Sequence, residues 1–409
     1  MSAAVLAINA GSSSLKFALF ADEDALALLA SGEVTGLGGT PRLRANSSSA
    51  GAATDRQLTD VATATDALAA VLEWIDVHFP HVHFSVIGHR VVHGGDRFHA
   101  AVAVSDDGVL RDLEALDPLA PQHQPYNLAA LRTLHMRFPR ALQVACFDTA
   151  FHAGWADRAR RIALPRRFHE AGVRRYGFHG LSYEYLAGRV GILAPDAHRV
   201  VLAHLGSGAS ICAVLDGRSV DTSMGFSVLD GLPMATRCGE IDPGVIFHLH
   251  RKYAMSFEQI EHLLYYDSGL KGVSALSGDM RDLLAAQTVE AVQAVDLFVY
   301  HCGRTVGAMA AAIGGVDALV FSGGIGANAP EIRERICANL GFLGVALDHA
   351  ANAAGGERIS DDRSTASVFA LATDEERIIA THSRSCLADS RVKAASIGRR
   401  SRLLTRAGA

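Results

Sequence analysis

Short runs of apolar residues alternate along this chain with longer segments in which apolar residues recur at helical spacing. The short runs predict strands at residues 85–92, 142–146, 200–205 and 317–321. Residues 283–313 have helical spacing and are followed by Gly314 and Gly315, which is typical of a helix carboxyl end. The alternation predicts an α/β protein in which helices are layered on a largely central sheet.

Two segments depart from this pattern. Residues 36–56 are rich in Gly, Ser and Ala, and we expect them to form hairpin loops outside the core. From Ser390 onward the chain is basic and has little apolar periodicity. We expect that segment to be a solvated or frayed end.

Length and charge limit the organisation of the protein and its partners. The 409 residues exceed what one hydrophobic core usually organises, so two domains are expected. A formal charge of -5 over this length gives no general basic field. We therefore expect small-molecule partners, with no nucleic acid and no membrane surface among them.

The cysteines and the apolar segments indicate a cytoplasmic protein. The six cysteines are scattered without a C-x-x-C pair, so we expect them to be reduced and mostly buried. The first residues lack a basic region, and their apolar run breaks at Asn9 before it reaches the length of a signal peptide. Residues 306–321 fall short of the ~20 residues that span a bilayer. They are expected to form a buried helix followed by a strand.

A near-repetition occurs about half a chain apart: VLAINAGSSSLKFALF from Val5 and VLAHLGSGASICAVL from Val201. Each copy is expected to form a strand, a turn of small residues and a second strand. Such turns expose successive backbone N–H groups that can bind phosphate oxygens. Ordinary tight hairpins are the alternative, because Gly-Ser turns are common connectors. Polar side chains in the first copy favour the functional interpretation, namely Asn9, Ser12, Ser14 and Lys16.

A third glycine turn, residues 321–330, follows a predicted strand and precedes a helix expected over residues 331–340, with Pro330 in its first turn. The spacing of Gly324, Gly326 and Ala329 also fits a dinucleotide-binding fingerprint, with Asp348 near the expected acidic position. The chain has no G-x-x-x-x-G-K-[ST] motif, which excludes a P-loop. A phosphate site built from several separate turns remains.

Charged side chains suited to phosphoryl transfer occur in short segments. Arg90 and Asp148 stand at the ends of predicted strands, where ligands of α/β sheets usually bind. His179 and Arg237 lie in glycine-containing segments. Each alone could be an ion-pair partner or a core residue, but their joint occurrence indicates a catalytic site.

At this point the sequence resembles the acetate kinase family. The resemblance is carried, in the order of the family's motifs, by NAGSSSLKF, GHRVVHGG, FDTAFH, RRYGFHG, HLGSGAS, DTSMGFS with TRCGEIDPG, SGGIGAN and TDEER. These motifs cover nearly all of residues 5–377. A match of this number and spacing is far more specific than a single glycine loop.

The resemblance implies the α/β fold shared with sugar kinases, actin and heat-shock ATPases, in which two RNase H-like domains close over a nucleotide cleft. It implies an amino-terminal domain over residues 1–150, completed by about 378–409. The second domain, residues 151–377, would bind the nucleotide and dimerise. It also implies a homodimer that uses ATP or ADP as co-substrate and Mg²⁺, or Mn²⁺ in its place.

The resemblance further assigns residues to roles. Asp148, His179 and Arg237 are implied as catalytic, with His179 and Arg237 stabilising the transition state. Arg90 is implied as the arginine that binds the carboxylate, and Asn9 and Glu375 as metal ligands. The acyl pocket is implied at Val92, Gln122, Phe178 and Val228. The implied nucleotide-binding residues are Ser12, Ser14, Lys16, His204, Leu205, Gly206, Ser207, Gly208, Asp279, Met280, Arg281, Gly324, Ile325, Gly326, Ala327 and Asn328.

These roles are chemically consistent with phosphoryl transfer between ATP and acetate. A carboxylic acid with a pKa near ~3.9 is already ionised at neutral pH, so it needs no general base. Asp148 is therefore expected to place Mg²⁺ or to orient other groups. Catalysis then depends on positioning and on neutralising the charge of two anions, for which arginine's planar fork is suited and lysine is not.

Several residues differ from those usual in the family. In the acyl pocket Gln122 replaces a leucine and Val228 a proline, from which we expect some tolerance for a larger or hydroxylated acid, such as propionate, butyrate or glycolate. Asparagine is the usual residue at three further positions, which here are Gln124, Ser207 and Asp374. Ala327 replaces a glutamate on the nucleotide side, which puts the selectivity for ATP in doubt.

Two other classes of protein are weighed as alternatives. A nicotinamide-dependent oxidoreductase would use Gly324, Gly326 and Asp348, and would change the fluorescence of NADH on mixing. An actin-like or chaperone-like ATPase would hydrolyse ATP without a carboxylate, and would leave Arg90 and the apolar pocket without a purpose.

Overall fold

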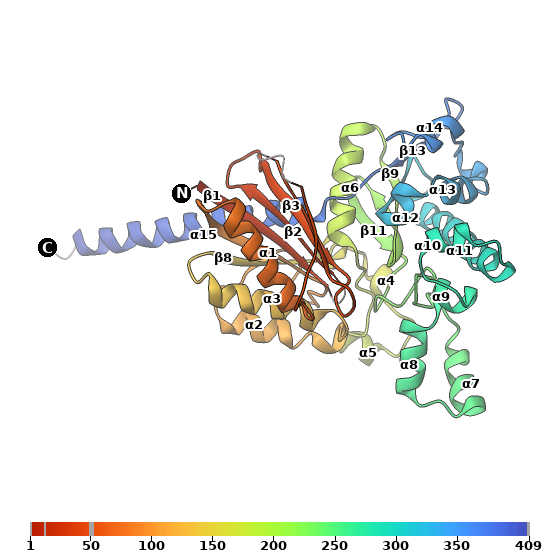
Figure 1. Cartoon of the computed structure of the whole chain (residues 1–409), viewed down its shortest axis with the longest axis horizontal. Helices are drawn as coiled ribbons and strands as arrows, with labels where there is room; N and C mark the ends of the chain where they lie inside the picture. Colours follow the sequence, from red (N-terminus) through yellow and green to blue (C-terminus); the bar gives the residue numbers. More distant parts are fainter. Residues whose placement is uncertain (1, 12–13, 49–52, 407–409) are drawn as a thin grey trace. The chain divides into compact units, whose positions relative to one another are not determined.

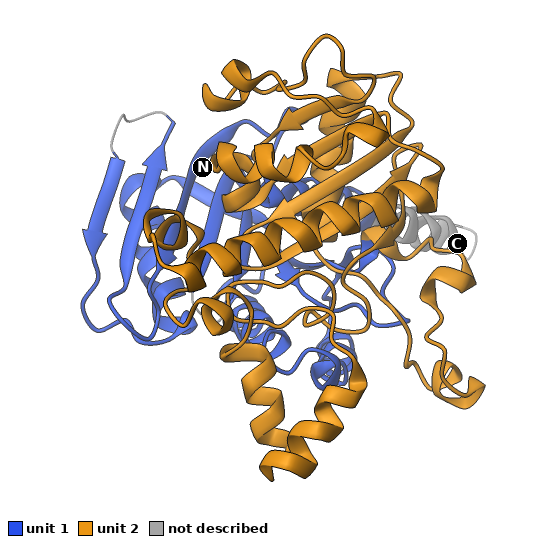
Figure 2. Ribbon diagram, turned by 90° about the vertical axis from the view of Figure 1, so that its right-hand side faces the viewer, with its two compact units in different colours: residues 1–150, 374–409 blue, residues 151–373 orange. Residues whose placement is uncertain are grey.

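A computed structural model describes residues 2–11, 14–48 and 53–406, with side chains as far as residue 392. It divides into two compact units (Figure 2). Unit 1 consists of Met1–Ala150 and Asp374–Ala409, and unit 2 of Phe151–Thr373. Unit 1 is thus built from both ends of the chain, which leaves it after Ala150 and returns at Asp374.

Unit 1 has a mixed sheet with strand order β5-β4-β3-β2-β1-β6-β8-β7. Figure 1 labels β1, β2, β3 and β8 of this sheet. Strands β1, β6 and β8 run parallel, and the other neighbours pair antiparallel. The strands are β1 (Ser2–Ala10), β2 (Ser14–Ala21), β3 (Leu28–Thr35), β4 (Arg42–Ser47), β5 (Ala53–Gln57), β6 (Val82–Val91), β7 (Val102–Ala103) and β8 (Leu142–Phe147). The helices are α1 (Ala64–His78), α2 (Asp107–Glu114), α3 (Gln124–Arg137) and α15 (Glu375–Arg406).

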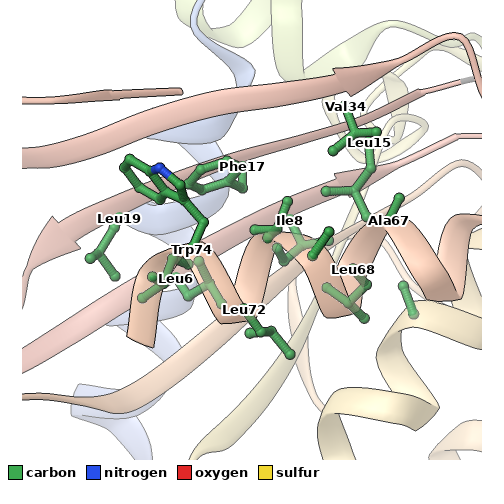
Figure 3. Close-up of a cluster of buried hydrophobic side chains, with 14 of the residues drawn as sticks. Leu6, Ile8, Leu15, Phe17, Leu19, Val34, Ala67, Leu68, Leu72 and Trp74 are labelled. Carbon is green, nitrogen blue, oxygen red and sulfur yellow. The ribbon is translucent and has the colours of Figure 1, made fainter. Parts of the chain in front are cut away.

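One face of this sheet packs against α1 and α3. Alternate residues of β1 and β2, among them Leu6, Ile8 and Phe17, point into a core that α1 completes with Leu68 and Trp74 (Figure 3). The α1 helix begins at a capping box in which Thr63 and Asp66 satisfy each other's backbone N–H groups. Full burial of each large apolar side chain stabilises the fold by about 1.5–3 kcal/mol.

The opposite face of the sheet packs against α15. A Cβ on Gly88 of β6 would lie 2.1 Å from the Ser383 hydroxyl and 2.6 Å from an Ile379 methyl carbon, so glycine permits the close approach of this helix. Because side chains alternate along a strand, Asn9 and Arg90 share this second face. The carboxyl ends of β1 and β6 therefore present polar side chains where α15 begins.

Unit 2 has a mixed sheet with strand order β11-β10-β9-β12-β13. Its strands are β9 (Arg199–Leu205), β10 (Ala209–Leu215), β11 (Arg218–Thr222), β12 (Ala318–Ser322) and β13 (Ser367–Ala370). Its helices are α4 (Asp157–Arg160), α5 (Arg166–Glu170), α6 (Gly180–Leu193), α7 (Pro243–Tyr253), α8 (Phe257–Tyr266), α9 (Gly269–Ser274), α10 (Met280–Ala285), α11 (Val289–Ile313), α12 (Gly323–Asn328), α13 (Pro330–Cys337) and α14 (His349–Ala353). Buried residues of α6 pack on alternate residues of β9, β10 and β12, and α11 also packs against β9 and β10.

The two sheets contain the same arrangement of neighbouring strands. The order β3-β2-β1-β6-β8 in unit 1 and the order β11-β10-β9-β12-β13 in unit 2 both consist of two antiparallel pairs followed by two parallel pairs. The repeated sequences from Val5 and Val201 form the equivalent hairpins, β1-β2 and β9-β10. The predicted strand-turn-strand structure of both copies is confirmed.

The predicted strands 85–92, 142–146, 200–205 and 317–321 are confirmed as β6, β8, β9 and β12. The prediction of loops for residues 36–56 is wrong. That segment contains β4 and part of β5, because Leu43 and Ala45 alternate with polar residues and are buried. Its Gly and Ser residues had obscured this short alternation.

The helix predicted for residues 283–313 ends as expected, at Gly314 with φ +77°, but is two helices. The Thr288 hydroxyl accepts the Ala291 N–H and starts α11 as an N-cap, so the chain breaks after α10. The glycine turn at 321–330 is also more helical than expected, since residues 323–328 form α12. Pro330 does open the next helix, which ends at Cys337.

The structure also describes the cysteines, the basic segment from Ser390 and the length of the helices. All six cysteines are free, and Cys146, Cys212, Cys302 and Cys337 are buried. The basic segment from Ser390, expected to be a solvated or frayed end, is helical as far as Arg406. In the parts of the chain that the structure describes, no helix has the length and apolar character needed to cross a membrane.

Candidate active site

The predicted site residues form one group in each unit. In unit 1 they gather where β1, β6 and β8 end and α15 begins. Asn9 is the next-to-last residue of β1, Arg90 that of β6, and Asp148 follows β8 directly. Glu375 is the first residue of α15. Parallel strands bring their carboxyl ends to one edge of the sheet, which is why residues so far apart in sequence meet here.

Arg90 is the centre of the unit 1 group. Its Nε and Nη2 donate to Asp148 Oδ2 at 2.9 and 2.5 Å, and its Nη1 donates to Asn9 Oδ1 at 3.2 Å. Asn9 Nδ2 donates in turn to Glu375 Oε2 at 3.0 Å. A guanidinium carries five N–H groups, so these contacts leave one on each terminal nitrogen. These hydrogen bonds fix the orientation of Arg90 and leave two of its N–H groups available to a ligand.

Burial and charge act against each other in this group. Burial alone would lower the pKa of Arg90, but Asp148, Glu375 and Glu376 outweigh it and raise that pKa above its ordinary value. Burial raises the pKa of Asp148, while the Arg90 guanidinium pulls it down. Asp148 Oδ1 is buried and has no hydrogen-bond partner among the described atoms. An acceptor of this kind fits a bound cation or a metal-bound water.

The carboxylates of Glu375 and Glu376 add negative charge to the unit 1 group. Glu376 Oε1 lies 3.4 Å from Asn9 Nδ2. Burial and the neighbouring Glu375 raise the pKa of Glu376, and Lys16 opposes them. The described residues contain no group of three or more His, Cys, Asp or Glu side chains that could hold a metal. Mg²⁺ usually binds through one or two carboxylates with waters and substrate phosphates, so the oxygen ligands present fit it.

Two amide side chains of α3 fix the loops around this group, and only one of them was singled out in the sequence. Asn127 accepts the Val92 N–H at 3.0 Å and donates to the Ala10 carbonyl at 2.5 Å, which joins the ends of β6 and β1. Gln124 accepts the His93 N–H at 3.1 Å and donates to the His93 carbonyl at 3.1 Å. Glutamine in place of the usual asparagine is therefore fully paired. Sequence spacing gave no sign of Asn127, because its partners are distant in the chain.

The other unit 1 predictions fall around the same loops. Val92 is buried and Gln122 is half-buried in the turn before α3. Ser14 closes the β1-β2 turn through its carbonyl, which accepts the Gly11 N–H at 2.8 Å, and Lys16 is exposed on β2. Ser12 lies outside the described residues. Asp374 caps α15 by accepting the Arg377 N–H at 2.9 Å.

In unit 2, His179 precedes α6 with φ +60°, a left-handed conformation that is uncommon for a residue with a side chain. Its Nδ1 lies 2.8 Å from Ser210 Oγ, and its ring stacks on His204 with centroids 4.5 Å apart. His204 Nδ1 lies 2.8 Å from Ser182 Oγ. Both imidazoles are thus oriented by serines of the adjoining elements, and Ser210 and Ser182 were not predicted.

Arg237 and His179 meet over the β9-β10 turn. A Cβ added to Gly208 would lie 2.7 Å from Arg237 Nη2 and 3.4 Å from His179 Nε2. Arg237 Nη1 also donates to the Val228 carbonyl at 2.7 Å. The structure therefore brings together His179, Gly208, Val228 and Arg237. Phe178, which precedes His179 in the chain, is fully buried.

The two glycine turns of unit 2 lie side by side. A Cβ on Gly206 would be 3.6 Å from Gly324 N, and one on Gly323, where φ is +74°, would be 2.5 Å from the Leu205 carbonyl oxygen. Arg333, which was not predicted, is fully buried and donates to the carbonyls of Gly326 and Ala327 at 2.9 Å each. It fixes the second turn.

The remaining nucleotide predictions are distributed around these turns. The side chains of Leu205 and Met280 are buried in the core, and Gly326 is buried as well. Ser207, Gly324 and Ala327 are more accessible, and Asn328 donates to the Gly324 carbonyl at 3.0 Å. Ile325 follows Gly324 within α12. Arg281 pairs with Asp279 at 2.5 Å, at the start of α10. Asp348, weighed as a ribose ligand, caps α14 by accepting two backbone N–H groups.

A protein-family model described as the acetokinase family matches residues 4–381. Acetate kinase of Rhodopseudomonas palustris (strain TIE-1) is 49% identical over 390 residues, which cover 93% of this chain and 98% of the relative. Acetate kinase of Methylocella silvestris is 47% identical over 399 residues, or 95% of this chain and 98% of the relative.

Solved structures give the same result. A propionate kinase from Francisella tularensis subsp. tularensis superimposes with a TM-score of 0.86 at 33% identity, covering 94% of this chain and 100% of its own. Acetate kinase of Porphyromonas gingivalis has a TM-score of 0.82 at 35% identity, with coverage of 94% and 100%. The predicted α/β fold with two RNase H-like domains is confirmed.

Proposed function

Because this chain belongs to the acetokinase family and is a phosphotransferase with a carboxyl group as acceptor, we propose that it phosphorylates acetate with ATP and catalyses the reverse reaction. The family resemblance seen in the sequence is thereby confirmed. The observation that carries the proposed substrate is the half-buried Arg90, which is held by Asp148 and Asn9 and keeps two N–H donors for an anion. Incubation with acetyl phosphate, ADP and Mg²⁺ should produce ATP.

Arg90 is proposed to bind the acetate carboxylate. Its two remaining N–H groups stand on the two terminal nitrogens, a geometry that suits bidentate contact with a carboxylate. Acetate is ionised at neutral pH and attacks without a base. Asp148 therefore acts by holding the guanidinium in place, through two hydrogen bonds to a single oxygen.

His179 and Arg237 are proposed to stabilise the phosphoryl group during transfer. Both side chains reach the space above Gly208 in the β9-β10 turn. Charge on the transferring group spreads over its equatorial oxygens, and fixed N–H donors stabilise that charge. The glycine turns at 206–208 and 323–326 offer backbone N–H groups for the rest of the nucleotide.

Mg²⁺, when bound, would neutralise phosphate charge, and Glu375 with Asp148 and Asn9 would hold it. We expect Glu375→Gln to raise the Mg²⁺ concentration needed for half-maximal activity by about tenfold or more, since it removes one charged ligand. A titration of ATP formation with MgCl₂ measures this. Glu357→Gln, at an exposed ion pair with Arg189, is the matched control. An unchanged Mg²⁺ requirement in Glu375→Gln would contradict the assignment.

Val92 and Gln122 of unit 1, and Phe178 and Val228 of unit 2, are proposed to determine which acid the protein accepts. Gln122 is half-buried and places a polar amide where leucine is usual in the family. We predict that propionate, butyrate or glycolate is used better than in family members with leucine at this position. Relative kcat/KM values for the four acids test this, and Gln122→Leu should restore a preference for acetate. A full acetate preference in the unsubstituted protein would refute it.

Nucleotide selectivity is proposed to be relaxed at Ala327. The carbonyl of this residue is fixed by Arg333, but its methyl group offers neither charge nor hydrogen bond. Comparison of ATP with GTP as donor addresses this directly.

The protein is proposed to be a homodimer that uses α7 and α8 of unit 2. The α7 and α8 helices are labelled in Figure 1. The α7 helix has no buried residue, and apolar side chains on both helices are exposed, including Phe247, Tyr253 and Phe257. Exposed apolar groups that gather in this way are typical of an interface. The cytoplasm is the proposed location, in agreement with six free cysteines.

The dimer proposal predicts that the double variant Phe247→Asp, Phe257→Asp is a monomer at micromolar concentration. Two carboxylates on the proposed interface would have to be desolvated on association. Light scattering coupled to size exclusion measures the mass. The control is Ile192→Asp, at a residue of α6 that is 74% exposed. A double variant of dimeric mass would refute this interface.

A further inference from the structure

The FDTAFH motif contains a second polar residue that the proposed reaction does not use. Asp148 belongs to unit 1, whereas His152 lies four residues later in unit 2 and is 1% exposed. Its ring is surrounded by Trp155, Tyr183 and Phe151 at centroid distances of 5.1–5.9 Å. A histidine buried among rings requires a reason for its polar atoms.

Both ring nitrogens of His152 have partners, and these determine its tautomer. Nε2 lies 3.0 Å from the Phe178 carbonyl oxygen, which only accepts, so Nε2 carries the proton. Nδ1 lies 2.7 Å from Ser219 Oγ and accepts its hydroxyl hydrogen. Ser219 Oγ accepts from Trp155 Nε1 at 2.8 Å. The chain of donors runs from Trp155 through Ser219 and His152 to Phe178.

Burial keeps this imidazole neutral. Desolvation lowers the pKa of His152 to about 4, against the opposing effect of the Phe178 carbonyl, and the charge of Arg175 adds to the lowering. The donor at Nε2 and the acceptor at Nδ1 are therefore both retained at neutral pH. The ring is a fixed connector in the hydrogen-bond chain.

The backbone that His152 holds is an unusual one. Gly177 has φ +79° and His179 has φ +60°, so two left-handed residues flank Phe178. A Cβ on Gly177 would lie 2.6 Å from His152 Cδ2 and 2.9 Å from the Trp155 ring. The imidazole thus packs directly against Gly177 and donates to the carbonyl of Phe178. Such backbone conformations persist when their surroundings fix them.

We infer that His152 is a positioning residue that sets the direction of both Phe178 and His179 through the Phe178 carbonyl. The inference rests on the proposed function, in which Phe178 lines the acyl pocket and His179 stabilises the phosphoryl group. His152 itself contacts neither substrate. Its effect on the reaction is transmitted through the backbone of residues 177–179, where an error of about 1 Å costs about 10²-fold in rate.

Replacement of His152 by leucine and by glutamine tests the inference. Leucine fills a similar space without polar atoms, while the glutamine amide can donate to the Phe178 carbonyl and accept from Ser219. We expect His152→Leu to lower kcat about 10- to 100-fold, with KM for ADP unchanged because the nucleotide turns are untouched. His152→Gln should recover most of this loss. The relative kcat/KM for acetate and butyrate should change in the leucine variant only.

A control separates positioning from loss of stability. Val190→Ala removes buried methyl groups from α6, in the core that also contains Tyr183, without touching the Phe178 carbonyl. It should unfold at a lower temperature and keep its kcat. A folded His152→Leu protein with unchanged kcat and acid preference would overturn the inference, and so would a glutamine variant no better than the leucine one.

If His152→Leu does not fold, Ser219→Ala decides the question. It leaves the His152 side chain in place but removes the hydrogen bond at Nδ1, together with the acceptor of the Trp155 Nε1–H. We expect kcat to fall about fivefold, the equivalent of one hydrogen bond. A second readout does not depend on activity. Nitrogen-15 NMR should show His152 as a single Nε2–H tautomer from pH 8 to pH 5.5, and an Nδ1–H tautomer or ordinary titration would overturn the geometry. An unsubstituted protein that makes no ATP would instead count against the proposed function.

Discussion

Replacing Arg90 with alanine is expected to lower kcat/KM for acetate by about 10²- to 10³-fold, the usual effect of removing a charged donor from a phosphoryl-transfer site. The variant loses the two N–H groups left for the substrate. It also leaves Asp148, which is 1% exposed, without its counter-charge. Removing one partner of a buried pair costs about 3–5 kcal/mol of stability, so unfolding should be measured alongside the kinetics.

Lysine at position 90 is the informative comparison. It keeps the positive charge beside Asp148 and therefore the fold, but it lacks the planar fork. A rate close to that of the alanine variant would show that geometry, and not charge alone, is required. Arg42→Ala on β4, which removes an exposed ion pair with Asp55 of β5, is the matched control and should change neither rate nor stability. A folded Arg90→Ala protein within about threefold of full activity would refute the assignment.

Arg237→Ala should give a different kinetic signature. Arg237 is proposed to contact the phosphoryl group only during transfer, so kcat should fall while KM for acetate stays nearly constant. Arg90→Ala should raise KM for acetate as well. Steady-state kinetics over a range of acetate concentrations separates the two roles.

Lowering the pH from 7 to 4.5 is expected to destabilise the protein strongly. Burial lowers the pKa of His89, His93 and His152 to about 4 each, from 6.5. Burial favours the neutral form because a charged imidazole would lose its hydration inside the protein. His89 Nε2 donates to the side-chain Oε1 of Gln143 at 2.8 Å, and His93 Nδ1 accepts the Gly95 N–H at 2.8 Å. Protonation would remove the acceptor at Nδ1 of His93 and would add a buried N–H group to His89.

The sign follows from linkage. The unfolded chain binds these protons near pH 6.5 and the folded one only near pH 4, so stability is full above pH 6.5 and falls as pH decreases to 4. Each histidine contributes about 3 kcal/mol over that window. Burial raises the pKa of Asp148, Asp230 and Glu376, and these carboxyls act in the opposite direction, so the net loss is smaller than the sum.

Urea unfolding at a series of pH values between 7.5 and 4.5 measures this dependence. His89→Gln, which cannot titrate, should reduce the slope of unfolding free energy against pH. The control is His83→Gln, at an exposed position on β6. A free energy of unfolding that is constant between pH 7 and pH 5 would contradict the prediction.

The sequence by itself determined the local elements and the kind of chemistry. Short runs of apolar residues specify β6, β8, β9 and β12, because such a run is a local property of the chain. Glycine-rich turns between paired apolar runs specified the hairpins β1-β2 and β9-β10. Arg90 and Asp148 could be placed at strand ends for the same reason. Errors arose where a short polar strand looked like a loop, at β4, and where a single hydroxyl, that of Thr288, divided a helix.

Only the tertiary structure decided which of these residues meet. Asn9 and Glu375 are 366 positions apart and lie in hydrogen-bond contact because α15 returns to the sheet that β1 began. Asn127 joins the loops after β1 and β6, and His152 holds the turn before His179, through partners that no spacing rule connects. Such contacts depend on strand order and helix packing, which arise from burial summed over the whole chain, and so they are absent from any local pattern.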